Sequence, residues 1–160
     1  MSFYLGVWNS ATAISDDEAA AHYLALSNEK SVEPGFDAQV YAFYCRLTGL
    51  YPEVEMVPED ELGACPWACG IEIPGDHVIM AIQPEKSERA IPQVMVLAEQ
   101  HELVCFDPQA RKVYLPPHLR AMQAGAANGA ACASRSKPRR GGMLGLLVRQ
   151  LLMGSVSGHR

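Results

Sequence analysis

The chain predicts an α+β fold, with an antiparallel sheet of about five strands and three helices on one of its faces. Short β-rich runs alternate with longer segments of helical periodicity, in the order β-α-α-β-β-α-β-β between residues 3 and 115. Turn residues join the later strands in pairs. This order is that of a split β-α-β arrangement, ferredoxin-like, with one extra helix and one extra C-terminal strand.

The first half of the chain predicts one strand and two helices. Residues 3–8 are rich in aromatic and other β-forming side chains, so they predict a strand. Ser15 and Glu18 match a capping box, and apolar residues at helical spacing follow them. A second helix is predicted over residues 36–50, where the apolar side chains share one stripe, and Pro52 ends it.

The second half predicts a strand hairpin, a helix and a second strand pair. In the first hairpin strand, residues 67–73, apolar and other side chains alternate. The second, residues 77–82, is almost wholly apolar, as a central strand would be. The helix contains Pro92, which the pattern tolerates only in a first turn. These elements are predicted at residues 67–73, 77–82, 88–101, 103–106 and 113–115.

Charge divides the chain near residue 120. Residues 1–120 hold all 18 acidic side chains but only seven of the 13 basic ones, a formal net charge of −11. Residues 121–160 hold no acidic side chain, six basic ones and many Ala and Gly residues. We therefore expect an acidic α+β domain over 1–120. The basic tail over 121–160 is expected to be largely disordered, with 143–153 as a candidate short helix.

Composition predicts a cytoplasmic protein without a cofactor. The five cysteines are an odd number and no secretory signal precedes them, which favours free thiols in a reducing compartment. No run approaches the ~18 apolar residues of a transmembrane segment. The acidic body does not suit specific binding of nucleic acid. Cys65 and Cys69 are four residues apart and lack a second pair, so no metal site is predicted.

Two patches are candidate binding sites for a partner. An acidic loop between Pro52 and residue 62 could dock a basic protein and accelerate encounter, or could simply be solvated. The turn that begins at Asp107 could be a recognition surface, or only the β-turn that its Asp-Pro pair favours. The candidate residues are Glu53, Glu55, Glu59, Asp60, Glu61, Asp107 and Gln109.

Two further hypotheses assign the chain a function other than binding a protein partner. The chain could be a small enzyme or ligand-binding domain that uses Cys105 with His77 or His101, because catalytic partners need only be adjacent in space. It could also be an oligomerising domain that pairs through an exposed sheet face. The sequence predicts neither an oligomeric state nor a substrate.

Four fragments resemble an uncharacterised family of small bacterial α+β proteins. The similarity covers roughly residues 3–117, and its most specific part is a helix followed by the pattern LVxxDPQ, here residues 103–109. The other fragments are Val7-Trp8, Phe43-Tyr44 with Leu50-Tyr51-Pro52, and Pro66-Trp67-Ala68. The family implies no activity. A looser similarity to toxin-immunity proteins implies a non-catalytic binding module, an immunity protein or antitoxin that masks a basic partner.

Overall fold

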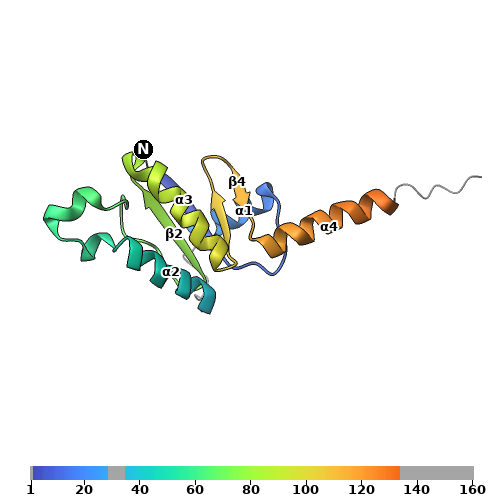
Figure 1. Ribbon diagram of the computed structural model, residues 1–160, viewed down its shortest axis with the longest axis horizontal. Helices are drawn as coiled ribbons and strands as arrows, with labels where there is room; N and C mark the ends of the chain where they lie inside the picture. The colour runs from blue at the N-terminus through green and yellow to red at the C-terminus, as the bar shows by residue number, and fades with distance from the viewer. Residues whose placement is uncertain (1, 29–34, 134–160) are drawn as a thin grey trace, which may run out of the picture.

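The computed structural model describes residues 2–28 and 35–133, with side chains through residue 125, and it is an α+β fold (Figure 1). The strands and α-helices follow the chain order β1, α1, α2, β2, α3, β3, β4, α4, with two short 3₁₀ helices before β2. Their bounds are β1 Phe3–Trp8, α1 Asp16–Ser27, α2 Ala38–Leu50, η1 Val54–Met56, η2 Glu59–Ala64, β2 His77–Ile82, α3 Pro84–Gln100, β3 Val104–Asp107, β4 Lys112–Tyr114 and α4 Pro117–Ala133.

The sheet has four antiparallel strands in the order β2-β1-β3-β4, rather than the five expected. The expected strand over 67–73 only borders the outer edge of β2, through two isolated bridges, Trp67 to Ile82 and Glu72 to Ile79. Between these bridges the segment advances five residues while β2 advances three. The two extra residues have no partners in β2 and interrupt the ladder, which explains why the fifth strand does not form.

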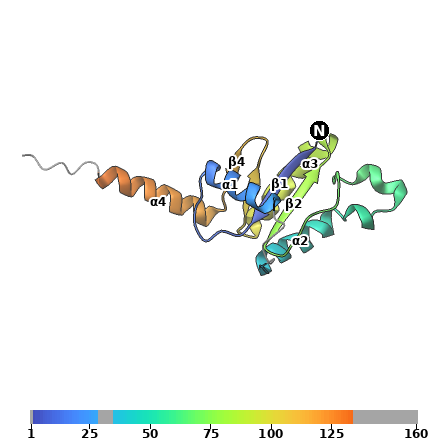
Figure 2. The same cartoon turned by 180° about the vertical axis from the view of Figure 1, so that it is seen from behind.

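Helices cover both faces of the sheet, so the expectation of three helices on one face is wrong. Helices α2 and α3 lie on one side of the sheet and α1 on the other (Figures 1 and 2). Leu5 and Val7 of β1 belong to the core beneath α2 and α3, whereas Trp8 belongs to the core beneath α1. The physical reason lies in the strands themselves. Every residue of β2 is buried, so the sheet has two apolar faces and each needs a cover.

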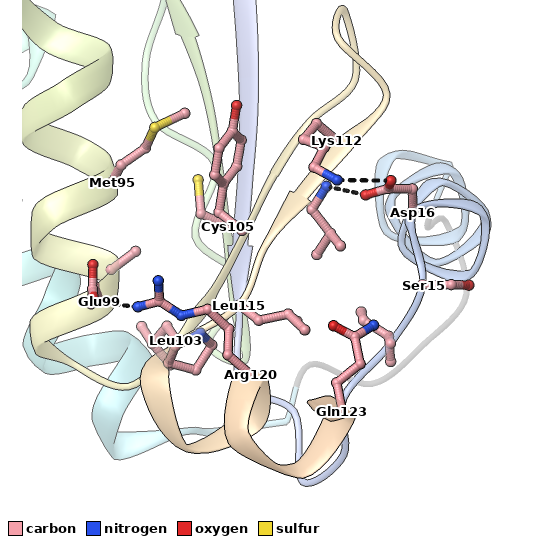
Figure 3. Close-up of a pocket in the computed structure, with 15 residues that line it drawn as sticks. Ser15, Asp16, Met95, Glu99, Leu103, Cys105, Lys112, Leu115, Arg120 and Gln123 are labelled. Atoms are coloured by element: carbon pink, nitrogen blue, oxygen red, sulfur yellow. Dashed lines mark hydrogen bonds and ion pairs between the residues drawn. The ribbon is translucent and has the colours of Figure 1, made fainter. Parts of the chain in front are cut away.

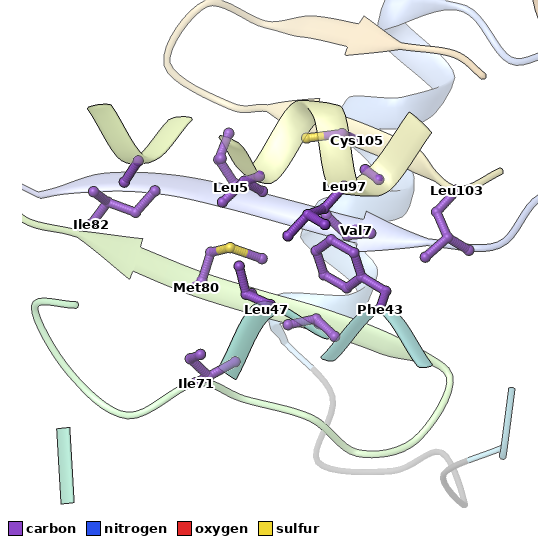
Figure 4. Packing of buried hydrophobic residues seen from close by; sticks show 14 of the residues in the cluster. Leu5, Val7, Phe43, Leu47, Ile71, Met80, Ile82, Leu97, Leu103 and Cys105 are labelled. Atoms are coloured by element: carbon purple, nitrogen blue, oxygen red, sulfur yellow. The ribbon is translucent and has the colours of Figure 1, made fainter. Parts of the chain in front are cut away.

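The larger core lies between the sheet and the pair α2 and α3 (Figure 4). Phe43 and Leu47 of α2 meet Met80 of β2 there, and all three are fully buried. The smaller core holds Phe106 with aromatic and aliphatic side chains of β1, α1 and α4. Gly6 permits this second core, because a β-carbon at that position would lie 2.7 Å from Cδ2 of Tyr23.

Helix α3 begins at Pro84, before the predicted start, so Pro92 lies inside the helix and not in its first turn. Pro84 occupies the first helical position, where its fixed φ is favourable and its missing N–H costs nothing. Pro92 is exposed, so water can bind the carbonyl group that its ring leaves without a helical donor. Solvent exposure therefore makes the internal proline tolerable.

Helix α4 runs through the expected domain boundary at residue 120. Its first turn buries Leu119 in the smaller core, and the helix then projects away from the body (Figures 1 and 2). Alanine is the strongest helix former, which explains why this Ala-rich stretch is helical as far as residue 133. The rest of the expected tail, with the candidate helix at 143–153, lies outside the described residues. None of the helices in the described part of the chain is long and apolar enough to cross a membrane.

Candidate functional site

The predicted acidic residues lie on a lobe that extends beyond the end of α2 (Figure 1). We call residues 53–64, which contain η1 and η2, the acidic lobe. Its base is held by Trp67, whose indole Nε1–H donates to the carbonyl oxygen of Tyr51 at 3.1 Å. The rings of Trp67 and Tyr51 also meet edge to face, with centroids 5.9 Å apart. The lobe is therefore anchored to the sheet through a buried tryptophan.

The five carboxylates of the acidic lobe face different surroundings. Glu53 accepts a hydrogen bond from the hydroxyl of Tyr44, and this bond raises the pKa of Tyr44 to about 12. Glu55, also on the lobe, lies against Gly70, where a β-carbon would come 3.1 Å from its Oε1. The remaining three, Glu59, Asp60 and Glu61, open η2 and are exposed to solvent. The structure thus places all five on one lobe, with Glu53 partly buried and the other four exposed.

The acidic lobe and the neighbouring helix also carry exposed apolar and aromatic side chains. Met56 is 77% exposed and Leu62 is also exposed, both within the acidic lobe. An aromatic row on the outer side of α2 leads toward the lobe, with ring centroids 5.9 and 6.4 Å apart, formed by Phe36, Tyr41 and Tyr44. Sequence reasoning missed these groups. The signal that could have found them is the presence of Met56 and Leu62 in a segment otherwise rich in charge.

The second predicted patch, Asp107 with Gln109, has a structural role. The Asp107 carboxylate accepts from the backbone N–H groups of Gln109 and Ala110 at 2.8 and 3.0 Å, which closes the β3–β4 turn. Gln109 Oε1 accepts from the N–H of Tyr4 at 3.0 Å, where β1 extends beyond its pairing with β3. This turn lies at the β4 edge of the sheet, while the segment that follows the acidic lobe borders β2 at the other edge. The structure does not bring the two patches together.

Cys105 and His77 lie on opposite faces of the sheet. Cys105 points into the core beneath α3, whereas His77 alternates with Val78 of the same core and so faces the other way. The His77 ring nitrogen Nδ1 lies 2.6 Å from Oδ1 of Asp76. His101 caps α3 and contacts the ring of Phe43. These positions do not assemble a cysteine–histidine pair.

Burial also makes Cys105 a poor nucleophile. The residue is 1% exposed, and burial raises the pKa of its thiol to about 12, with a smaller contribution from Asp107. Because the thiolate is the reactive form, a thiol with so high a pKa is almost wholly protonated at neutral pH. The cysteine hypothesis receives no support from this geometry.

Cysteine alkylation checks this description directly. In the native protein we expect iodoacetamide at pH 8 to label the exposed Cys45 and Cys69, and to label Cys65 and Cys105 at least ~100-fold more slowly. Peptide mass spectrometry would give each rate, and the unfolded chain is the control in which all four should react. Native labelling of Cys105 as fast as Cys45 would contradict the buried placement.

A cleft that sequence reasoning did not foresee lies at the β4 edge of the sheet (Figure 3). Its volume is about 410 Å³, within the range of small-ligand sites. Helix α3 forms one wall, β3 and β4 the floor, and the first turns of α1 and α4 the rest. The residues that form it are far apart in the sequence, so no local motif marks it.

Two ion pairs line this cleft. Lys112 Nζ donates to Asp16 Oδ2 at 3.1 Å, and Arg120 donates to Glu99. Asp16 Oδ1 also accepts from the N–H of Val113 at 2.8 Å, so its carboxylate satisfies the free edge of β4. The backbone bond from Val113 and the bond from Lys112 lower the pKa of Asp16. The four charged groups sum to zero, which makes the cleft formally neutral.

The described residues contain no group of three or more His, Cys, Asp or Glu side chains that could hold a metal ion. What the arrangement offers instead is two surfaces for non-covalent binding: the acidic lobe with its exposed apolar groups, and the cleft with its paired charges. Compared with protein-family models, with curated proteins and with solved structures, the chain matches none of them.

Proposed function

We propose that this protein is a non-catalytic, cytoplasmic protein-binding module that docks a basic partner on its acidic lobe, as an immunity protein or antitoxin masks a toxin. One observation carries the proposal. Glu59, Asp60 and Glu61 are exposed and make no ion pair within the described residues, and the apolar side chains of Met56 and Leu62 are exposed beside them.

The contrast with other carboxylates supports this proposal. Asp16, Asp17 and Glu99 are also exposed or partly exposed, and each has a Lys or Arg partner in the fold. Among the described residues the lobe carboxylates have none, and three of them are consecutive, unlike the separate exposed Glu72, Glu85 and Glu88, so their fields add and attract cationic surfaces. Unpaired charges of one sign steer encounter and reject like-charged partners.

Apolar side chains within the acidic lobe offer hydrophobic contact area, which the carboxylates cannot provide. Protein interfaces combine an apolar centre with a polar rim, and methionine is enriched among their contacts because its side chain adapts in shape. Met56 and Leu62 are exposed apolar groups on the same lobe as the carboxylates. The bond from Trp67 to Tyr51 holds the base of the lobe, so less conformational entropy is lost on binding.

The test is a charge reversal with a matched control. The lobe variant combines Glu59→Lys, Asp60→Lys and Glu61→Lys, and the control combines three equal reversals at exposed positions outside the lobe, Glu72, Glu85 and Glu88. A partner is cross-linked in cells of the source organism, identified and purified. We expect the lobe variant to weaken its binding by at least ~100-fold and the control by less than ~5-fold.

The salt dependence of the affinity, together with the two triple variants, distinguishes docking on the lobe from attraction by net charge. The affinity of the unmodified protein for the purified partner should fall as salt rises, and the association rate should fall with it. An identified partner whose affinity is lowered equally by both triple variants responds to net charge only. That result, or binding that the lobe variant leaves intact, would sink the proposal.

A further inference from the structure

The cleft at the β4 edge is lined by apolar side chains as well as by its two ion pairs. Met95 and Ala98 of α3 stand on one side, and Leu103 and Leu115 border the floor (Figure 3). Cys105 lies at the bottom as a protonated thiol and so adds no charge. A ligand that fills this volume therefore meets apolar side chains and charged groups together.

The charged groups of the cleft can exchange partners at small cost. The Lys112–Asp16 and Arg120–Glu99 pairs are both about half exposed, and such pairs contribute little to stability. Arg120 uses one of its five N–H donors for Glu99, which leaves donors for a carboxylate. Lys112 uses one of three for Asp16.

Charge balance selects the kind of ligand. Because Arg120 and Glu99 are adjacent, a purely anionic ligand on Arg120 would lie beside the like charge of Glu99, and a purely cationic ligand on Glu99 would lie beside Arg120. A zwitterion avoids both outcomes, because its carboxylate binds the guanidinium while its ammonium binds Glu99. The second pair, on the other wall, can receive a more distant polar end in the same way.

We propose that the cleft between α3, β4 and α4 binds a small zwitterion with an apolar body, of the apolar amino acid or dipeptide class. Its carboxylate lies on Arg120, its ammonium on Glu99, and its apolar side chain between Met95 and Leu115. The site is on the opposite edge of the sheet from the segment that borders β2, so this proposal does not depend on the acidic lobe.

The probe is the dipeptide Leu-Leu, titrated into the full chain by calorimetry and by NMR of backbone amides. We expect shifts at Leu115 and Gln123, which line the cleft, and saturable binding. N-acetyl-Leu-Leu, which lacks the ammonium, and Leu-Leu-amide, which lacks the carboxylate, should each bind at least ~10-fold more weakly. Gly-Gly, which lacks the apolar body, should not bind measurably.

Variants locate the two contacts. Arg120→Gln should weaken Leu-Leu by at least ~10-fold, whereas Arg89→Gln, an exposed position of α3 outside the cleft, should leave its affinity unchanged. Glu99→Gln should weaken Leu-Leu but not N-acetyl-Leu-Leu, a difference that a merely structural role would not produce. The absence of cleft shifts with millimolar Leu-Leu overturns the proposal. Equal binding of the acetylated form, or full binding by the Arg120 variant, also overturns it.

Discussion

Replacing Trp67 with alanine should lower the free energy of unfolding by about 3–5 kcal/mol. The side chain is 1% exposed, contacts the Tyr51 ring and donates to the Tyr51 carbonyl oxygen. Its removal creates a cavity in the larger core and leaves that carbonyl oxygen without its donor. Chemical denaturation measures the loss directly.

The same substitution should also loosen the acidic lobe. Trp67 joins the base of the lobe to the edge of β2, so amide hydrogen exchange over residues 53–64 should accelerate more than exchange in β1. Leu62→Ala is the control within the lobe, because its side chain is exposed, and it should cost less than about 1 kcal/mol. Equal stability of the Trp67 and Leu62 variants would show that the tryptophan is not the anchor.

Replacing Phe106 with alanine should cost a similar ~3–5 kcal/mol, but on the other face of the sheet. Phe106 is 1% exposed and packs against Tyr23 and Trp8, with ring centroids 5.7 and 6.3 Å away. Helix α1 rests on this cluster, so its amides should lose protection first. Thermal or chemical unfolding gives the free energy, and hydrogen exchange gives the location.

Tyr114→Ala is the matched control for Phe106, since it removes an aromatic ring from the neighbouring strand at an exposed position. It should cost less than half as much. Partner binding by the acidic lobe should change by less than ~2-fold in the Phe106 variant, because the lobe rests on the opposite core. An unaffected α1, or a lobe that loses binding together with α1, would contradict two separate cores.

Local signals in the chain predicted several elements well. Ser15 and Glu18 form the expected capping box, with both reciprocal hydrogen bonds present, and α1 begins at the next residue. The apolar stripe over 36–50 predicted α2, which ends at Leu50 as expected, although its cap by Asp37 was not predicted. The strand at residues 3–8 begins and ends as predicted. These features depend on neighbours within a few positions, which is why periodicity and capping patterns reveal them.

Features that depend on distant contacts were not predicted. The segment over 67–73 has the alternation of a strand, but its pairing depends on register against β2, and the two-residue bulge interrupts it. A proline inside any helix removes one backbone hydrogen bond, and the sequence does not show whether that position is exposed. In the fold Pro92 is exposed, which makes its internal position acceptable. The second face of the sheet was missed because a wholly apolar strand indicates burial without saying which helix provides the cover.

The same division holds for the candidate sites. Residue order alone shows that the acidic side chains concentrate before residue 120, and that five of them fall within nine consecutive positions. The fold was needed to establish that four of these are exposed while Glu53 is partly buried, and that Met56 and Leu62 are exposed on the same lobe. The cleft was wholly a tertiary result, because Asp16, Glu99, Lys112 and Arg120 come from separate elements. Charge density is a property of consecutive residues, whereas a neutral pocket of paired charges exists only after distant segments pack together.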